Sequence, residues 1–159
     1  MNWELFALRV VLATIAGLLI GYEREIQGKG AGLKTNALVA LGSAIFILMA
    51  LRFQNEESVD ITRVLGQIVV GIGFIGAGTI LEKKRKIQGL TTAAIVWCSA
   101  ATGCLAGFGM YTELGIISGL ILIINLVFGY VEHEMIKKNE QDEEKKVTAN
   151  YLSASSILL

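Results

Sequence analysis

The chain has 159 residues, 53% of them hydrophobic, with 18 glycines, no proline and a formal net charge of zero. Ordinary soluble domains contain about 45–50% apolar residues, so this composition argues against a soluble globular protein. The balanced charge gives no basic surface of the kind that nucleic acids attract, and we expect no nucleic-acid partner.

The hydrophobic residues gather in runs, each long enough to cross a hydrocarbon core of about 30 Å as a helix. The fold class expected is an all-α membrane protein, a bundle of five transmembrane helices. One transmembrane domain covers residues 1–132, and a short cytoplasmic tail covers residues 133–159. In chain order the expected spans are Trp3–Tyr22, Thr35–Leu51, Val64–Leu81, Leu90–Gly107 and Thr112–Val131.

Lysine and arginine in the connections predict how the bundle is oriented. Basic residues favour the cytoplasmic side of a membrane. The third connection contains the run Lys83–Lys86, and the first connection and the start of the tail are also basic. The second connection mixes both signs of charge, and the fourth, Phe108–Tyr111, has no basic residue. These charges predict an N-terminus outside and a C-terminus in the cytoplasm.

Small residues indicate where the helices pack, because lipid gives helices no hydrophobic reason to associate and close backbone approach replaces it. The third and fourth spans are rich in glycine and alanine on several faces, so we expect them at the centre of the bundle. Residues Gly71–Gly76 also match the G-x-G-x-x-G spacing of a dinucleotide site. That motif requires a strand–turn–helix context, which an apolar span does not offer, so we interpret these glycines as packing residues.

The polar residues of interest within the expected spans are Arg9, Glu113 and Asn125. A buried arginine is costly in a membrane. Arg9 either extends to the outer headgroups or pairs with Glu113, which lies at a matching depth. Asn125, like Asn36 near the start of the second span, is expected to form a hydrogen bond to a neighbouring helix.

More polar residues gather where the first span ends and the second begins. Glu23 and Arg24 are adjacent in sequence, so at least one of them must turn away from lipid. Two roles fit these carboxylates: interhelical ion pairs that fix the bundle, or oxygen ligands for a hard cation. The candidates for ligand or ion binding are Glu23, Arg24, Glu25, Asn36, Thr91 and Thr92.

The sequence offers no catalytic pattern. It has no nucleophile–base pair, no phosphate loop and no histidine–cysteine–carboxylate cluster at metal-ligand spacing, and we expect neither an enzyme nor a cofactor. Cys98 and Cys104 are interpreted as small buried hydrophobic residues. His133 is expected to be solvated at the membrane edge.

Four ordered sequence blocks closely resemble the MgtC/SapB family of bacterial membrane proteins. They lie between about Val10 and Gly109 and comprise Gly21–Glu25, Ala31–Gly42, Gly71–Gly78 and Gln88–Trp97. The resemblance implies a multi-pass protein of the bacterial inner membrane, linked to magnesium homeostasis, stress adaptation or virulence. Many members add an ACT-like soluble domain after the last span, most of which the short tail does not contain.

The leading functional hypothesis is a non-enzymatic membrane regulator of the MgtC/SapB type. The resemblance implies the F-type ATP synthase as one membrane partner. The other expected partners are the lipid bilayer and a second copy of the chain. A homodimer is favoured, since a single set of five spans suits a subunit that must oligomerise. The alternative is an oligomeric cation transporter or channel of the Mg²⁺ type. In that case a divalent cation is the ligand, with Glu23, Arg24 and Asn36 near its pathway.

Overall fold

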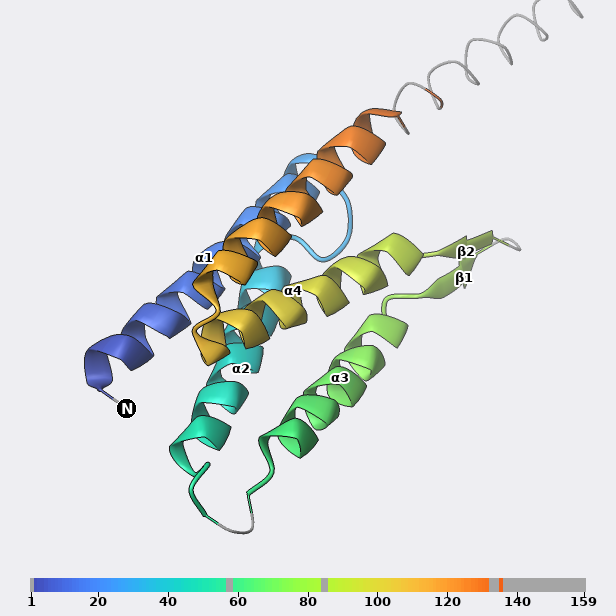
Figure 1. Ribbon diagram of the computed structural model, residues 1–159. Helices are drawn as coiled ribbons and strands as arrows, with labels where there is room; N and C mark the ends of the chain where they lie inside the picture. Colours follow the sequence, from blue (N-terminus) through green and yellow to red (C-terminus); the bar gives the residue numbers. More distant parts are fainter. Residues whose placement is uncertain (1, 57–58, 84–85, 132–134, 136–159) are drawn as a thin grey trace, which may run out of the picture. The chain divides into compact units, whose positions relative to one another are not determined.

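The computed structural model describes residues 2–56, 59–83, 86–131 and 135. The elements in chain order are α1 (Trp3–Ile26), α2 (Leu33–Arg52), α3 (Ile61–Ala77), β1 (Leu81–Lys83), β2 (Lys86–Gln88) and α4 (Leu90–Phe108), followed by a helix over Tyr111–Val131 (Figure 1). The chain forms two compact units, Met1–Leu122 and Ile123–Leu159, with the boundary inside the last helix. The packing described below lies within the first unit.

Four of the described helices, α1, α2, α4 and Tyr111–Val131, are long and apolar enough to cross a membrane. Their bounds agree with the predicted spans to within four residues. The third span is placed differently, because α3 covers Ile61–Ala77 rather than Val64–Leu81 and has 17 residues. Its start is set by Asp60, whose carboxylate accepts hydrogen bonds from the backbone N–H groups of Thr62 and Arg63, a strong N-terminal cap.

The expectation of a purely helical fold is corrected by a short β-hairpin between α3 and α4. Strands β1 and β2 pair antiparallel, with Leu81 opposite Gln88 and Glu82 opposite Ile87. The sequence indicated only a basic loop here, because the strands have three residues each and their inner ends belong to the charged run Lys83–Lys86.

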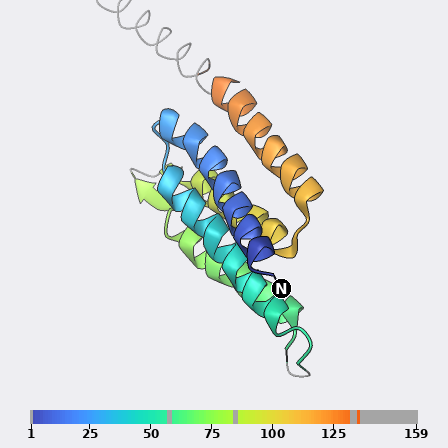
Figure 2. The same ribbon diagram turned by 90° about the vertical axis from the view of Figure 1, so that its left-hand side faces the viewer.

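Helix α2 packs between α1 and α4 through two very close backbone approaches, and Figure 2 shows α1 in blue beside α2 in cyan. A Cβ atom on Gly17 of α1 would lie 2.5 Å from the carbonyl oxygen of Asn36, and one on Gly103 of α4 would collide with the backbone of Ala40. Each glycine has a second one four residues later, Gly21 and Gly107, which also faces α2. This small-xxx-small spacing is the one that lets helices approach in a membrane.

The prediction that the third span lies at the centre is wrong for this chain, although the fourth span does lie there. The buried residues of α3 are Ile68 and Gly76, whereas α4 buries nine. Added Cβ atoms on Gly66 and Gly71 of α3 would meet no atom within 4 Å. Glycine content therefore indicated which helices are able to approach closely, but not which ones do.

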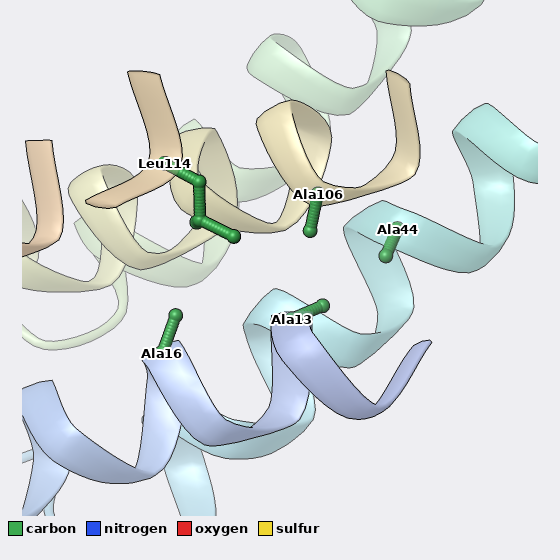
Figure 3. Close-up of a cluster of buried hydrophobic side chains, with 5 residues drawn as sticks. All are labelled: Ala13, Ala16, Ala44, Ala106 and Leu114. Carbon is green, nitrogen blue, oxygen red and sulfur yellow. The ribbon is translucent and has the colours of Figure 1, made fainter. Parts of the chain in front are cut away.

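The core of the first unit is built mainly from small side chains. Figure 3 shows one cluster in which side chains from four helices point toward one another: Ala13, Ala16, Ala44, Ala106 and Leu114. A second cluster contains Ile20, Ile95 and Ile121, and a third contains Ile47, Ile68 and Cys104. Alanine at the contacts keeps the helix axes close, so polar groups on facing helices come within hydrogen-bonding distance.

Candidate functional site

Asn36 forms the centre of a polar network at the end of the bundle where α2 begins. Its side chain is fully buried. The Nδ2 group donates hydrogen bonds to the carbonyl oxygens of Ala31 and, at 3.0 Å, Gly32, and Oδ1 accepts one of 2.7 Å from the hydroxyl of Ser99 on α4. The predicted interhelical hydrogen bond of Asn36 is thus present, and its donors and acceptor are satisfied.

Arg24 lies in the same region and is only 3% exposed. Its Nε and Nη2 atoms donate to the carbonyl oxygen of Gly30 at 3.3 Å, and Nη2 also donates to the hydroxyl of Thr92 at 2.9 Å. The guanidinium therefore joins the end of α1, the connection to α2 and the first turn of α4. The sequence predicted that at least one of Glu23 and Arg24 turns away from lipid, and in the structure both side chains are buried.

Glu25 has a capping role in this arrangement. Its Oε2 accepts a 3.2 Å hydrogen bond from the backbone N–H of Leu33, the first residue of α2. A carboxylate at a helix N-terminus satisfies a backbone donor and interacts favourably with the helix dipole. Glu25 itself is exposed, so it links the two helix ends at the surface.

Glu23 is the residue of this region that has a buried side-chain oxygen without a hydrogen-bond partner among the described residues. It is 7% exposed, and its Oε2 atom has no hydrogen-bond partner among the described residues. A buried carboxylate oxygen without a donor costs free energy, which a cation or a donor from another molecule would recover. Thr91, also predicted here, is exposed and is not drawn into the network formed by Thr92.

Ser99 is a functional candidate that the sequence analysis missed. It is fully buried and supplies the α4 side of the Asn36 hydrogen bond. The signal was its spacing, because Ser99 follows Thr92 by seven residues, two helical turns, and so lies on the same face of α4.

Arg9, at the opposite end of α1, has a different partner from those considered. Its Nη1 donates a 2.9 Å hydrogen bond to the carbonyl oxygen of Gly107, in the last turn of α4. Within the part of the chain that the structure describes, Arg9 forms no ion pair with Glu113, which is exposed. The guanidinium of Arg9 instead caps the C-terminus of α4, which is the negative end of the helix dipole.

The remaining predictions fall at the C-terminal end of the chain. The Nδ2 atom of Asn125, in the second unit, has no hydrogen-bond partner among the described residues. His133 and the tail, residues 133–159 except Met135, lie outside the described residues. In the described part of the chain, no group of three or more histidine, cysteine or acidic side chains lies in a position to hold a metal ion.

Comparison with known proteins places the chain among bacterial membrane proteins, although no solved structure matches it. It is 40% identical over 155 residues to the "Putative magnesium transporter YhiD" of Escherichia coli (strain K12), covering 93% of this chain and 72% of that protein. It is 43% identical over 113 residues to "Protein MgtC" of Brucella abortus (strain 2308), covering 71% of this chain and 47% of that protein. It is 41% identical over 122 residues to "Protein MgtC" of Salmonella typhimurium (strain 14028s / SGSC 2262), covering 77% of this chain and 52% of that protein.

The chain therefore spans about half the length of these two MgtC proteins. The family model described as "MgtC family" matches residues 10–134, most of the chain and all of α2, α3 and α4. The resemblance found in the sequence blocks is confirmed: the chain is a multi-pass membrane protein that belongs to the MgtC family.

Proposed function

We propose that this chain is a non-enzymatic regulator in the bacterial inner membrane, which supports magnesium homeostasis, stress adaptation or virulence by binding a membrane partner. The observation that carries the proposal is the burial of Arg24, 3% exposed, in the region where ligands for a cation were expected. Like charges repel strongly away from water, so a permanent guanidinium there disfavours a resident divalent cation.

The hydrogen bonds of Arg24 support the same proposal. They hold the α1–α2 connection against Thr92 of α4, so this connection keeps one arrangement at the end of the bundle. A preorganised surface reduces the conformational entropy lost on binding a partner. The F-type ATP synthase is a membrane partner consistent with the family resemblance.

The topology of the proposal follows the loop charges: five spans, with the N-terminus outside and the Arg24 region on the cytoplasmic side. Helix α3, with 17 residues, is the third of these spans and completes the five. At 1.5 Å per residue it measures about 25 Å, slightly short of a hydrocarbon core of about 30 Å, a mismatch that local thinning of the bilayer accommodates.

A homodimer is part of the proposal. Between α2 and α3 lies an apolar cavity of about 510 Å³, with Gly42, Ser43 and Gly71 among its lining residues. The hydroxyl of Ser43 has no hydrogen-bond partner in the described part of the chain. A helix from a second copy would fill the cavity and offer that hydroxyl a partner.

The alternative function is an oligomeric cation transporter or channel of the Mg²⁺ type. Two facts favour it: the unpartnered, buried Oε2 atom of Glu23, and the name of the Escherichia coli relative. A carboxylate oxygen is a ligand that hard cations prefer. In this version Glu23 contacts the ion and Arg24 positions the connection beside it.

A growth assay tests the site that both versions share. The host lacks its own MgtC-family protein and is grown at low magnesium with the full chain or a variant. We expect Glu23→Gln and Arg24→Gln to abolish complementation under conditions in which each variant is still folded in the membrane, which a measurement of its membrane content checks. The exposed residues Glu4 and Lys34 give matched controls, since Glu4→Gln and Lys34→Gln should complement fully. Full activity of both site variants would overturn the proposed site.

A flux assay separates the two versions. The purified chain in liposomes should pass neither Mg²⁺ nor other divalent or monovalent cations, and a membrane protein should copurify with the wild type but not with Arg24→Gln. Cation flux that Glu23→Gln abolishes would replace the regulator with the transporter.

A further inference from the structure

Two neighbouring cavities lie at the end of the first unit where α1 begins and α2 and α4 end. The larger, about 610 Å³, has a polar side formed by Arg9, Arg52, Gln54 and Asn55. The smaller, about 300 Å³, is an apolar groove lined by Trp3, Phe6, Leu48 and Met49. Arg52 lines both cavities, so a charged region and an apolar groove meet at one side chain.

The charged cavity has an excess of positive charge. Among the residues that the structure describes, no acidic side chain lines it. Among the described residues, neither Arg9 nor Arg52 forms an ion pair. A guanidinium carries five N–H donors, and the hydrogen bond to Gly107 uses one of those of Arg9. The Nε atom of Arg9 is buried and has no hydrogen-bond partner in the described part of the chain. This cavity is therefore complementary to an anion with several acceptor oxygens.

Phosphate matches these groups best. Two guanidinium groups offer the planar forks that bind phosphate oxygens in pairs. The side-chain amides of Gln54 and Asn55 add uncharged donors and acceptors, which suit the hydroxyl groups of a headgroup.

The apolar groove identifies the source of the phosphate. A free phosphate ion has no apolar part that could bind in the groove beside Arg52. A phospholipid has acyl chains next to its phosphate, and one of them can lie in this groove. Trp3 and Phe6 stack with ring centroids 5.6 Å apart along this groove. Tryptophan side chains such as Trp3 are enriched at the headgroup level of membranes.

We propose that the two cavities form one binding site for an anionic phospholipid. The phosphate contacts Arg9 and Arg52, the headgroup hydroxyls contact Gln54 and Asn55, and one acyl chain lies in the groove beside Trp3. The site lies at the opposite end of α1 from Arg24, and it does not depend on whether the chain regulates a partner or moves an ion.

Native mass spectrometry of the purified full chain in detergent tests the site, with phosphatidylglycerol as the anionic probe and phosphatidylcholine as the zwitterionic one. We expect phosphatidylglycerol to bind about tenfold more tightly, because phosphatidylcholine has no headgroup hydroxyls for Gln54 and Asn55 and its choline cation is repelled by the two guanidinium groups. The exposed side chain of Arg52 allows Arg52→Gln without loss of the fold, and this variant should lose about that factor. Arg63→Gln is the matched control, since Arg63 lines neither cavity.

Two further measurements separate the parts of the site. Trp3→Ala, at a position 80% exposed, should weaken phosphatidylglycerol binding without affecting the fold. Inorganic phosphate and glycerophosphoglycerol at matched concentrations should not displace the lipid. Equal affinity for the two lipids, or unchanged binding by Arg52→Gln, overturns the proposal. Displacement by inorganic phosphate overturns the lipid assignment in favour of a free-anion site.

Discussion

The hydroxyl of Ser99 on α4 donates a 2.7 Å hydrogen bond to Oδ1 of Asn36 on α2, and both side chains are fully buried. The same asparagine binds the carbonyl oxygen of Gly32, so one side chain fixes both the start of α2 and its position against α4. Inside a bilayer no water is present to replace these hydrogen bonds, so the link between the two helices depends on this network.

Replacing Asn36 should therefore destabilise the bundle. Asn36→Ala leaves the Ser99 hydroxyl and two carbonyl groups without their partner, and we expect the free energy of unfolding in detergent to fall by about 1–3 kcal/mol. Ser99→Ala removes a single bond and should cost about 0.6–2 kcal/mol. The neighbouring Thr35 is exposed, so Thr35→Ala should leave the unfolding curve unchanged. If all three variants unfold alike, the network does not stabilise the bundle.

Glycine replacement should distinguish the packed helices from the open one. A Cβ atom at Gly103 would collide with the backbone of Ala40, so Gly103→Ala forces α4 away from α2 and should destabilise the protein by about 1–3 kcal/mol. A Cβ atom at Gly71 of α3 would meet nothing within 4 Å, so Gly71→Ala should be neutral in the monomer. Thermal unfolding of both variants in detergent measures the contrast. Equal loss of stability would contradict the arrangement of α2 between α1 and α4.

Most of the helical framework could be predicted from the sequence, because hydrophobic length is a strong constraint in a membrane. The inward turn of at least one of Glu23 and Arg24, and the buried contact of Asn36, followed from the cost of leaving polar groups in lipid. What could not be predicted is the identity of several partners. Arg9 and Arg24 both bind backbone carbonyl groups, of Gly107 and Gly30. Every residue has such a carbonyl, so residue type does not reveal which one is used.

The placement of α3 failed for a related reason. Its glycines predicted a central helix, but a small side chain only permits close approach, and the partner must offer a matching surface. Gly17 and Gly103 meet such a surface on α2, whereas Gly66 and Gly71 face open space. The hairpin between α3 and α4 was missed because strands of three residues are too short for an alternating pattern to stand out.

The start of α3 should depend on pH through Asp60, which lies outside the helix it caps. Hydrogen bonds from the hydroxyl of Thr62 at 2.6 Å and from its backbone N–H at 2.8 Å lower the pKa of this carboxyl below its ordinary value of 3.8. Because the pKa is lower in the folded state, the stabilisation is fully present above pH 3.8 and is lost as pH falls through the folded-state pKa. The protection factor of the Thr62 amide, which is its exchange rate corrected for the intrinsic rate at each pH, should fall over that window in the wild type. In Asp60→Asn the protection factor should show no such step. A step that persists in this variant would have to come from another group.

The side chain of Arg24 at the end of α1 donates a 2.9 Å hydrogen bond to the hydroxyl of Thr92 in the first turn of α4. Arg24→Gln and Thr92→Val should each destabilise the bundle, and their effects should not add: we expect a coupling energy of about 0.5–3 kcal/mol from a double-mutant cycle in detergent. Arg24→Lys should not restore stability, because one ammonium group does not reproduce the fork that reaches both Thr92 and the Gly30 carbonyl. Thr91→Val is the matched control, since Thr91 is exposed and should show no coupling to Arg24. Equal coupling for Thr91 and Thr92 would mean that the guanidinium makes no specific bond to Thr92, and the fixed α1–α2 connection of the proposed regulator would lose its structural basis.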